Sequence, residues 1–150
     1  MKKKLISIFL ALALAVCAFP VSAFAAVNPG NIASPMVGTV VDNHYVLSIN
    51  TQEYRVPLNT VLSYTNPGPN TKNDYVKIGQ MALNCAYGRN PNAQCYVGNP
   101  DGYFGLQTHT GTVAFQEFWH TVMYSSTNLD LEADGIIGNK TWRALSNYCL

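Results

Sequence analysis

The chain has 150 residues, only 11% of them charged, and a formal net charge of +1 at neutral pH. Three of its nine basic side chains lie within the first four residues, so removal of the N-terminus would leave six basic and eight acidic groups. A charge of −2 does not favour nucleic acid or an anionic membrane as a partner, because both need a basic surface. The length allows one domain with a modest core, or a small domain with an appendage.

The N-terminus has the pattern of a secretory signal peptide. Lys2-Lys3-Lys4 precedes an apolar run over residues 5–19, which ends at Pro20 and is followed by Ala23-Phe24-Ala25. A basic start, an apolar core and an Ala-x-Ala site predict cleavage after Ala25. A membrane anchor is the alternative, but the apolar run is short for a bilayer span. We therefore expect residues 1–25 to be a signal peptide and the protein to be secreted, extracellular or in the cell wall.

Residues 26–73 are predicted to hold short strands. Residues 37–49 and 53–62 are rich in Val, Thr, Tyr and Ile, with turn candidates at Asp42-Asn43 and Asn50-Thr51-Gln52, which indicates two or three strands. Residues 64–73 are rich in Pro, Gly and Asn and read as a linker or surface crossing. This segment is too small to hold a core alone. We expect it to pack on the rest of the chain, to pair with another chain, or to stay loose.

A short pattern occurs twice: Asp101-Gly-Tyr-Phe-Gly-Leu-Gln-Thr108 and Asp134-Gly-Ile-Ile-Gly-Asn-Lys-Thr141. Asp followed by Gly predicts a tight turn in which the glycine has positive φ. The two residues after it are apolar, so we expect them to point inward. The second Gly is expected to be the N-cap of a helix, and the Thr to return its hydroxyl to the open amides of the first turn. These positions are Gly102, Gly105 and Thr108 in the first copy and Gly135, Gly138 and Thr141 in the second.

Helical periodicity begins at residue 74 and predicts three helices. The first has Ile78 and Ala82 beside its apolar face, the second begins near Leu106 and continues into residues 119–123, and the third covers residues 139–147. Residues 123–133 are expected either to extend the second helix or to form a loop. The predicted buried positions are Val76, Gly79, Leu83 and Ala86 in the first helix, Gly111, Phe115, Phe118 and Val122 in the second, and Trp142 and Leu145 in the third.

With Phe115-Gln116 after the first copy and Trp142-Arg143-Ala144-Leu145 closing the second, residues 74–148 resemble the small three-helix peptidoglycan-binding module of secreted bacterial cell-wall proteins. The resemblance implies a mainly α fold: a three-helix bundle with turn repeats over residues 74–150, preceded by the short β-containing segment 26–73. Family members usually carry Leu at the position of Gly79. The glycine would weaken the first helix by about 1 kcal/mol and leave out one core side chain, with Ile78 filling in from the flank.

Three cysteines remain after signal cleavage: Cys85, Cys95 and Cys149. Export favours a disulfide. Cys85 and Cys95 bracket a loop that is longer than in the family, and we favour a bond between them, worth roughly 2 to 3 kcal/mol, with Cys149 free. A Cys85–Cys149 bond is the alternative.

The sequence gives no support for a metal, a cofactor or a catalytic residue. Residues 130–135 resemble the start of a calcium-binding loop, but Thr141 stands where the closing Glu belongs. Turn formation already accounts for Asp101 and Asp134, so they are not expected to be a catalytic carboxylate pair. His109 and His120 would lie about 16 Å apart on one helix, too far to share a metal.

The candidate ligand-binding side chains are those with aromatic faces or hydrogen-bonding groups near the two turns. Within the first turn we favour Tyr103 and Gln107, while Trp142 is also a candidate core residue, because an aromatic at helical spacing usually packs. The candidates are Tyr87, Tyr103, Gln107, Asn139, Trp142 and Arg143.

The resemblance implies a secreted, non-enzymatic protein that binds a glycan or stem peptide of peptidoglycan and holds itself, or a hydrolase acting in trans, at the wall. Nucleic acid, and membrane after signal cleavage, are not expected partners. One alternative is a small cell-wall hydrolase between the strands and the helices, for which His44, Glu53 and Asp42 would have to cluster. Another is a secreted interaction or inhibitor protein that has kept only the fold.

Overall fold

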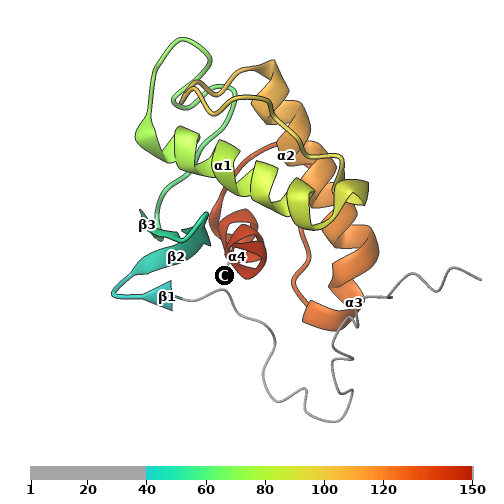
Figure 1. The fold of residues 1–150 in the computed structure, drawn as a ribbon. Coiled ribbons are helices and arrows are strands. Elements are labelled where there is room, and N and C mark those ends of the chain that lie inside the picture. The colour runs from blue at the N-terminus through green and yellow to red at the C-terminus, as the bar shows by residue number, and fades with distance from the viewer. Residues whose placement is uncertain (1–39, 150) are drawn as a thin grey trace, which may run out of the picture. The chain divides into compact units, whose positions relative to one another are not determined.

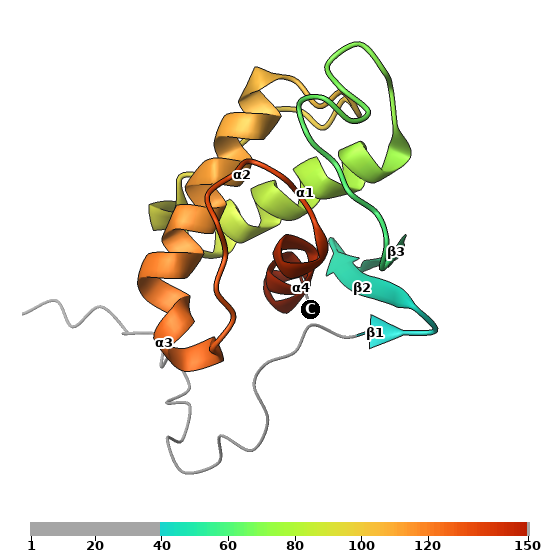
Figure 2. The ribbon, with the colours of Figure 1, turned by 180° about the vertical axis from the view of Figure 1, so that it is seen from behind.

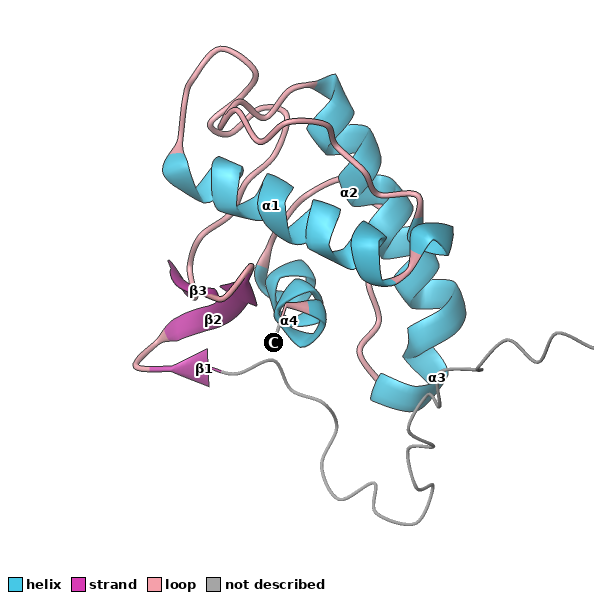
Figure 3. Ribbon diagram, viewed as in Figure 1, coloured by secondary structure: helices cyan, strands magenta, loops and turns pink. Residues whose placement is uncertain are grey.

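The computed structural model describes residues 40–149, so the expected signal peptide and residues 26–39 of the N-terminal segment lie outside the described residues. The described part consists of a small antiparallel sheet followed by helices (Figures 1 and 3). None of these helices has the length and apolar character needed to cross a bilayer. The elements are β1 (Val40–Val41), β2 (His44–Ile49), β3 (Gln52–Pro57), α1 (Asp74–Arg89), the 3-10 turn η1 (Pro91–Ala93), α2 (Leu106–Phe118), the π-helical turn η2 (Trp119–Met123), α3 (Tyr124–Thr127) and α4 (Asn139–Tyr148).

The sheet has the order β1-β2-β3, and both connections are the predicted turns. Asp42-Asn43 and Asn50-Thr51 all have positive φ, the geometry of two-residue hairpin loops. Alternate residues of β2 are buried, with Tyr45 and Leu47 completely inaccessible, so one face of the sheet carries the core. The second strand was expected to reach residue 62 but ends at Pro57, where the missing N–H cannot continue a ladder.

The segment before α1 packs on the helical part, which decides among the alternatives for this region (Figure 2). The Ser48 N–H donates to the carbonyl of Cys149, at the end of α4. Leu62 and Ile137 exchange backbone hydrogen bonds of 3.2 and 2.9 Å, and the Trp142 indole donates to the Thr60 carbonyl at 3.1 Å. The strands and the following loop therefore complete the core of the helices.

Helix α1 begins where predicted, because the Asn73 side chain accepts from the backbone N–H groups of Tyr75 and Val76. Its predicted apolar face is buried. Gly79, however, is not a missing core side chain: a Cβ there would lie 3.1 Å from the Ile137 side chain and 3.4 Å from that of Trp142. These two side chains occupy the space that a larger residue would fill.

The end of the second predicted helix differs from the expectation at Val122, which is 51% exposed. The reason is η2: a π-helical turn takes more residues than an α-helical turn and rotates the following positions around the axis. Trp119 is completely buried and Met123 packs against the core instead. The link after η2 combines both expected forms, since the short helix α3 follows η2 directly and the chain then becomes irregular.

Helix α4 buries Trp142 and Leu145, as predicted. Tyr148 in its last turn contacts three aromatic rings of α2 and η2, with centroid separations from 5.9 to 6.4 Å. These edge contacts join the end of α4 to the second helix.

All three cysteines of the described chain are free thiols, so the favoured Cys85–Cys95 disulfide is not present. The thiols of Cys85 and Cys95 contact different backbone carbonyls. Cys95 donates to the Leu83 carbonyl at 3.2 Å, whereas Cys85 is directed toward the end of α4 and donates to the Tyr148 carbonyl at 3.7 Å.

Candidate functional site

The two Asp-Gly segments have the same local geometry. Gly102 and Gly135 have φ of +85° and +70°. In each turn the Asp carboxylate accepts from the backbone N–H two residues later, at 2.9 Å for Asp101 and 2.8 Å for Asp134. Positive φ at the glycine reverses the chain, and the carboxylate fixes the reversal.

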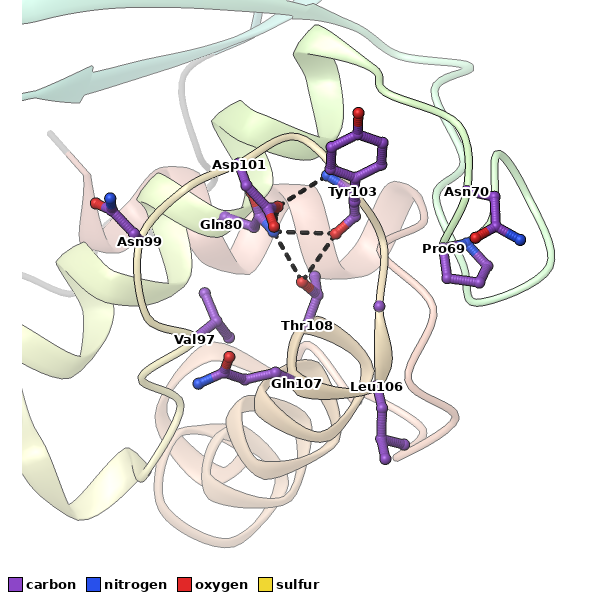
Figure 4. Close-up of a pocket in the computed structure, with 11 residues that line it drawn as sticks. Pro69, Asn70, Gln80, Val97, Asn99, Asp101, Tyr103, Leu106, Gln107 and Thr108 are labelled. Carbon is purple, nitrogen blue, oxygen red and sulfur yellow. Dashed lines mark hydrogen bonds between the residues drawn. The ribbon is translucent and has the colours of Figure 1, made fainter.

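A buried glutamine from the preceding helix holds each turn. The Gln80 amide nitrogen lies 2.9 Å from Asp101 Oδ1, 3.1 Å from the Tyr103 carbonyl and 2.9 Å from the Thr108 hydroxyl (Figure 4). Its oxygen accepts from the Gly102 N–H at 2.9 Å. Because Gln80 is only 2% exposed, these hydrogen bonds replace water that the turn would otherwise need.

Gln116 makes the corresponding contacts with the second turn. Its nitrogen lies 2.9 Å from Asp134 Oδ1, 3.0 Å from the Ile136 carbonyl and 3.1 Å from the Thr141 hydroxyl, and its oxygen accepts from Gly135 N–H at 2.9 Å. Helix α1 therefore fixes the turn before α2, and α2 fixes the turn before α4.

The two threonines do not cap the helices as expected. Each hydroxyl donates backward, Thr108 to the Tyr103 carbonyl at 3.4 Å and Thr141 to the Ile136 carbonyl at 3.0 Å, and accepts from the glutamine. The predicted N-cap glycines, Gly105 and Gly138, do precede α2 and α4, but neither helix has a side-chain cap. The threonines belong to the turn because the glutamine amide donates to their hydroxyl oxygens and the turn's own backbone carbonyl accepts their hydroxyl protons.

A pocket of about 510 Å³ opens beside the first turn; we call it the first-turn pocket. Figure 4 shows its walls coming from the loop before α1, from residues 97–101 and from the start of α2. Gln80, Asp101 and Thr108 line it, together with side chains that reach solvent: Asn70, Asn99, Tyr103, Leu106 and Gln107. Leu106 is 68% exposed and Tyr103 39% exposed. The opening thus combines amides and a phenol with an apolar edge.

Asp101 supplies the negative charge at this pocket. Its hydrogen bond from Gln80, assisted by that from the Tyr103 backbone and by the charge of Lys72, lowers the pKa of the carboxyl group below its usual value. Asp101 is therefore ionised at neutral pH. The pocket presents one carboxylate among neutral groups, an arrangement suited to hydroxyl, amide and ammonium groups of a ligand.

A smaller pocket of about 270 Å³, the second-turn pocket, lies at the equivalent place beside the second turn. Asn139 and Lys140 line it where Leu106 and Gln107 line the first, and Glu132 lies nearby. Of the predicted ligand-binding residues, Asn139 thus belongs to this second pocket. The two turns have the same geometry, but the pockets beside them differ in chemistry.

The remaining predicted ligand contacts lie elsewhere. Tyr87 contacts Tyr96 near the end of α1, with ring centroids 5.5 Å apart and the rings tilted by 44°, and Arg143 is close enough to Tyr45 for its charge to act on that hydroxyl. Trp142 is completely buried and is a core residue, so its assignment as a ligand contact is wrong. The first-turn pocket brings together only Tyr103 and Gln107 of the predicted set.

The residues needed for the hydrolase alternative do not form an acid–base cluster. His44 contacts the backbone carbonyl of Asp42 at 2.7 Å, while the carboxylates of Glu53 and Asp42 lie 2.8 and 3.9 Å from Arg55. Within residues 40–149, no group of three or more potential metal ligands is close enough to hold an ion.

A histidine and a carboxylate do meet at a place that was not predicted. His120 Nδ1 lies 2.6 Å from Asp130 Oδ1, and both side chains are more than half exposed. The pair lines a pocket of about 320 Å³. The spacing of the two residues along the chain gives no signal for it, because the contact depends on the π-helical turn and the loop after α3.

Gln80 is the site residue that the sequence analysis missed. Gln80 directly follows Gly79, so in the sequence it is a polar residue beside the apolar face of the first helix. The available signal was its analogy with Gln116, since each Asp-Gly turn is preceded by a helix with a glutamine directly beside its core positions.

Comparisons of the chain with protein-family models, with curated proteins and with solved structures find no match. The sequence and the geometry described above therefore carry the functional argument.

Proposed function

We propose that this protein is a secreted, non-enzymatic module that binds bacterial peptidoglycan, and that its helical part is a three-helix peptidoglycan-binding bundle with turn repeats. The observation that carries the proposal is the pair of Asp-Gly turns, each held by a glutamine of the preceding helix, with an open pocket beside the first turn. The module would hold itself, or a hydrolase acting in trans, at the wall.

The chemistry of the first-turn pocket favours a wall glycan or stem peptide as ligand. Amide side chains such as Asn99 and Gln107 both donate and accept hydrogen bonds, which matches hydroxyl and acetamido groups. The exposed faces of Tyr103 and Leu106 offer apolar contact to a sugar ring or an alanine methyl group. Asp101 would attract an amino group of a stem peptide.

The test is co-sedimentation of the purified protein with insoluble peptidoglycan sacculi, with cellulose as the control for non-specific retention on an insoluble glycan. We expect retention on sacculi without release of soluble wall fragments over time. No retention, with no release, would instead support a secreted interaction protein that has kept only the fold.

Variants locate the contact surface. Tyr103→Ala and Gln107→Ala should each reduce retention on sacculi several-fold, because both side chains line the first-turn pocket. Tyr87→Ala and Tyr96→Ala serve as matched controls, since this tyrosine pair is exposed but lies outside that pocket. Equal losses in all four variants would remove the first-turn pocket from the proposal.

One observation favours a wall hydrolase whose site lies elsewhere than between the strands and the helices: the His120–Asp130 pair in its surface pocket. A carboxylate that orients an imidazole is part of many acid–base sites. If sacculi release soluble fragments and His120→Ala abolishes the release, the protein is an enzyme at this place. If His120→Ala changes neither retention nor release, the pair is only a hydrogen bond on the surface.

A further inference from the structure

Two cysteines from distant parts of the sequence meet where α1, α4 and β2 come together. Cys85 lies in α1, and Cys149 directly follows α4. Cys85 Sγ lies 3.7 Å from the Tyr148 carbonyl oxygen and Cys149 Sγ 3.7 Å from the Ala82 carbonyl oxygen, and the two thiols are close enough for one to donate to the other in place of its carbonyl. Each thiol lies against the backbone that carries the other cysteine.

The two thiols differ in their access to solvent. Cys85 is partly exposed and lines a pocket of about 430 Å³, between α1, the β2–β3 turn and Pro100. Cys149 is completely buried and does not line that pocket. A small reagent that enters this pocket therefore meets Cys85, whereas Cys149 is shielded from it.

The surroundings also make Cys85 the more nucleophilic thiol. The hydrogen bond from Cys149, with the nearby charge of Arg89, lowers the pKa of Cys85 to about 6 against the effect of its burial. The hydrogen bond with Cys85, together with burial, raises the pKa of Cys149. Burial raises that of Cys95 to about 11. At neutral pH the reactive thiolate is thus at Cys85.

We propose that Cys85 and Cys149 form a thiol–disulfide exchange site whose reactant is a low-molecular-weight disulfide and whose oxidised form is a Cys85–Cys149 disulfide. The Cys85 thiolate attacks one sulfur of the reagent, forms a mixed disulfide and releases one thiolate. Cys149 then attacks the Cys85 sulfur and transfers its proton to the departing sulfur of the reagent, which leaves as the second thiol. Two protein thiols are oxidised and one reagent disulfide is reduced to two thiols. This site is independent of the proposed wall binding.

The bond would join elements that are now held by non-covalent contacts. It would link α1 to the end of α4, and through the hydrogen bond from Ser48 to Cys149 it would fix the end of α4 on β2. It closes a long loop of the chain, so oxidation should raise the melting temperature by on the order of 10 °C.

Peptide mapping of the wild-type protein tests the proposal directly. Trypsin cuts after Lys77, Arg89, Lys140 and Arg143, so Cys85, Cys95 and Cys149 fall in separate peptides, 78–89, 90–140 and 144–150. The reduced protein is incubated with oxidised glutathione at pH 7 and digested without reductant. The expected product links peptides 78–89 and 144–150, with a loss of about 2 Da in the intact protein.

Variants separate the two steps. Cys149→Ser should stop at one glutathionyl group on Cys85, Cys85→Ser should leave Cys149 unmodified, and the control Cys95→Ser should form the same linked peptide as the wild type. Linkage of peptide 78–89 to peptide 90–140, persistence of the mixed disulfide in the wild type, or no reaction at all would each overturn the proposal. None of these outcomes depends on the folding of a variant.

Discussion

Replacement of Gln80 by Leu tests whether the glutamine determines the first turn. The change removes two N–H donors, which share three acceptors, and one acceptor, so the buried Gly102 N–H loses its partner. At about 1 kcal/mol net for each of these three groups, with about 1 kcal/mol more for the unpaired N–H, less about 1 kcal/mol regained by burial of the leucine side chain, we expect a loss of about 3 kcal/mol in the free energy of unfolding.

Urea unfolding followed by circular dichroism measures this loss, and an unchanged m-value would show that the native state stays compact. Gln116→Leu should cost a similar amount, because its contacts with the second turn correspond one by one. Gln107→Leu is the matched control: this exposed glutamine lies in α2, and its replacement should change stability by less than about 0.5 kcal/mol.

The two glutamines should differ in function even where they agree in stability. Gln80 lines the first-turn pocket and Gln116 the second, so at a temperature where both variants are folded, Gln80→Leu should lose more retention on sacculi. If Gln80→Leu lowers the free energy of unfolding by less than about 1 kcal/mol, or if Gln107→Leu lowers it by the same amount as Gln80→Leu, the assignment of Gln80 as the residue that holds the turn is refuted.

Other substitutions and acid titration test neighbouring features. Gly135→Ala should destabilise the protein by more than about 2 kcal/mol in thermal melts, because φ is +70° and the new Cβ would lie 2.1 Å from the His109 ring. The control Gly105→Ala, whose Cβ would meet no atom within 4 Å, should cost less than about 1 kcal/mol by the same measurement. The pKa of Asp101 is lowered in the folded state by its hydrogen bonds from Gln80 and the Tyr103 backbone, so its stabilising contribution is complete above the ordinary pKa of about 4 and is lost as the pH falls through the lowered value. Urea midpoints measured from pH 5 downward should therefore fall more steeply for the wild type than for Asp101→Asn, and parallel curves would contradict this.

The sequence predicted elements whose causes are local. Asp-Gly pairs, hairpin turns and helical periodicity depend on neighbouring residues, and the two hairpin turns, α1, α4 and the positive φ of Gly102 and Gly135 lie where these signals placed them. The α2 register failed at Val122 because the π-helical turn is stabilised by tertiary packing of Trp119 rather than by a local signal.

The candidate site was only partly predictable for the same reason. Tyr103 and Gln107 flank a turn and were named from it, whereas Gln80 reaches that turn from 21 residues away. Trp142 illustrates the opposite error: an aromatic side chain suits both a core and a sugar, and only its packing beside Gly79 decides. Which cysteine lies beside Cys85 depends on the direction in which α1 points that side chain, and composition does not determine this direction.

The glutamine contacts also bear on how the connecting segments can be engineered. The separation between Gln80 and Asp101 is 21 residues and that between Gln116 and Asp134 is 18, yet both pairs meet at 2.9 Å. The chain length between helix and turn is thus not fixed by the contact. An affinity tag or recognition peptide inserted beside exposed Asn92, in the first of these connections, should leave both turns intact and make this protein a scaffold for displayed sequences.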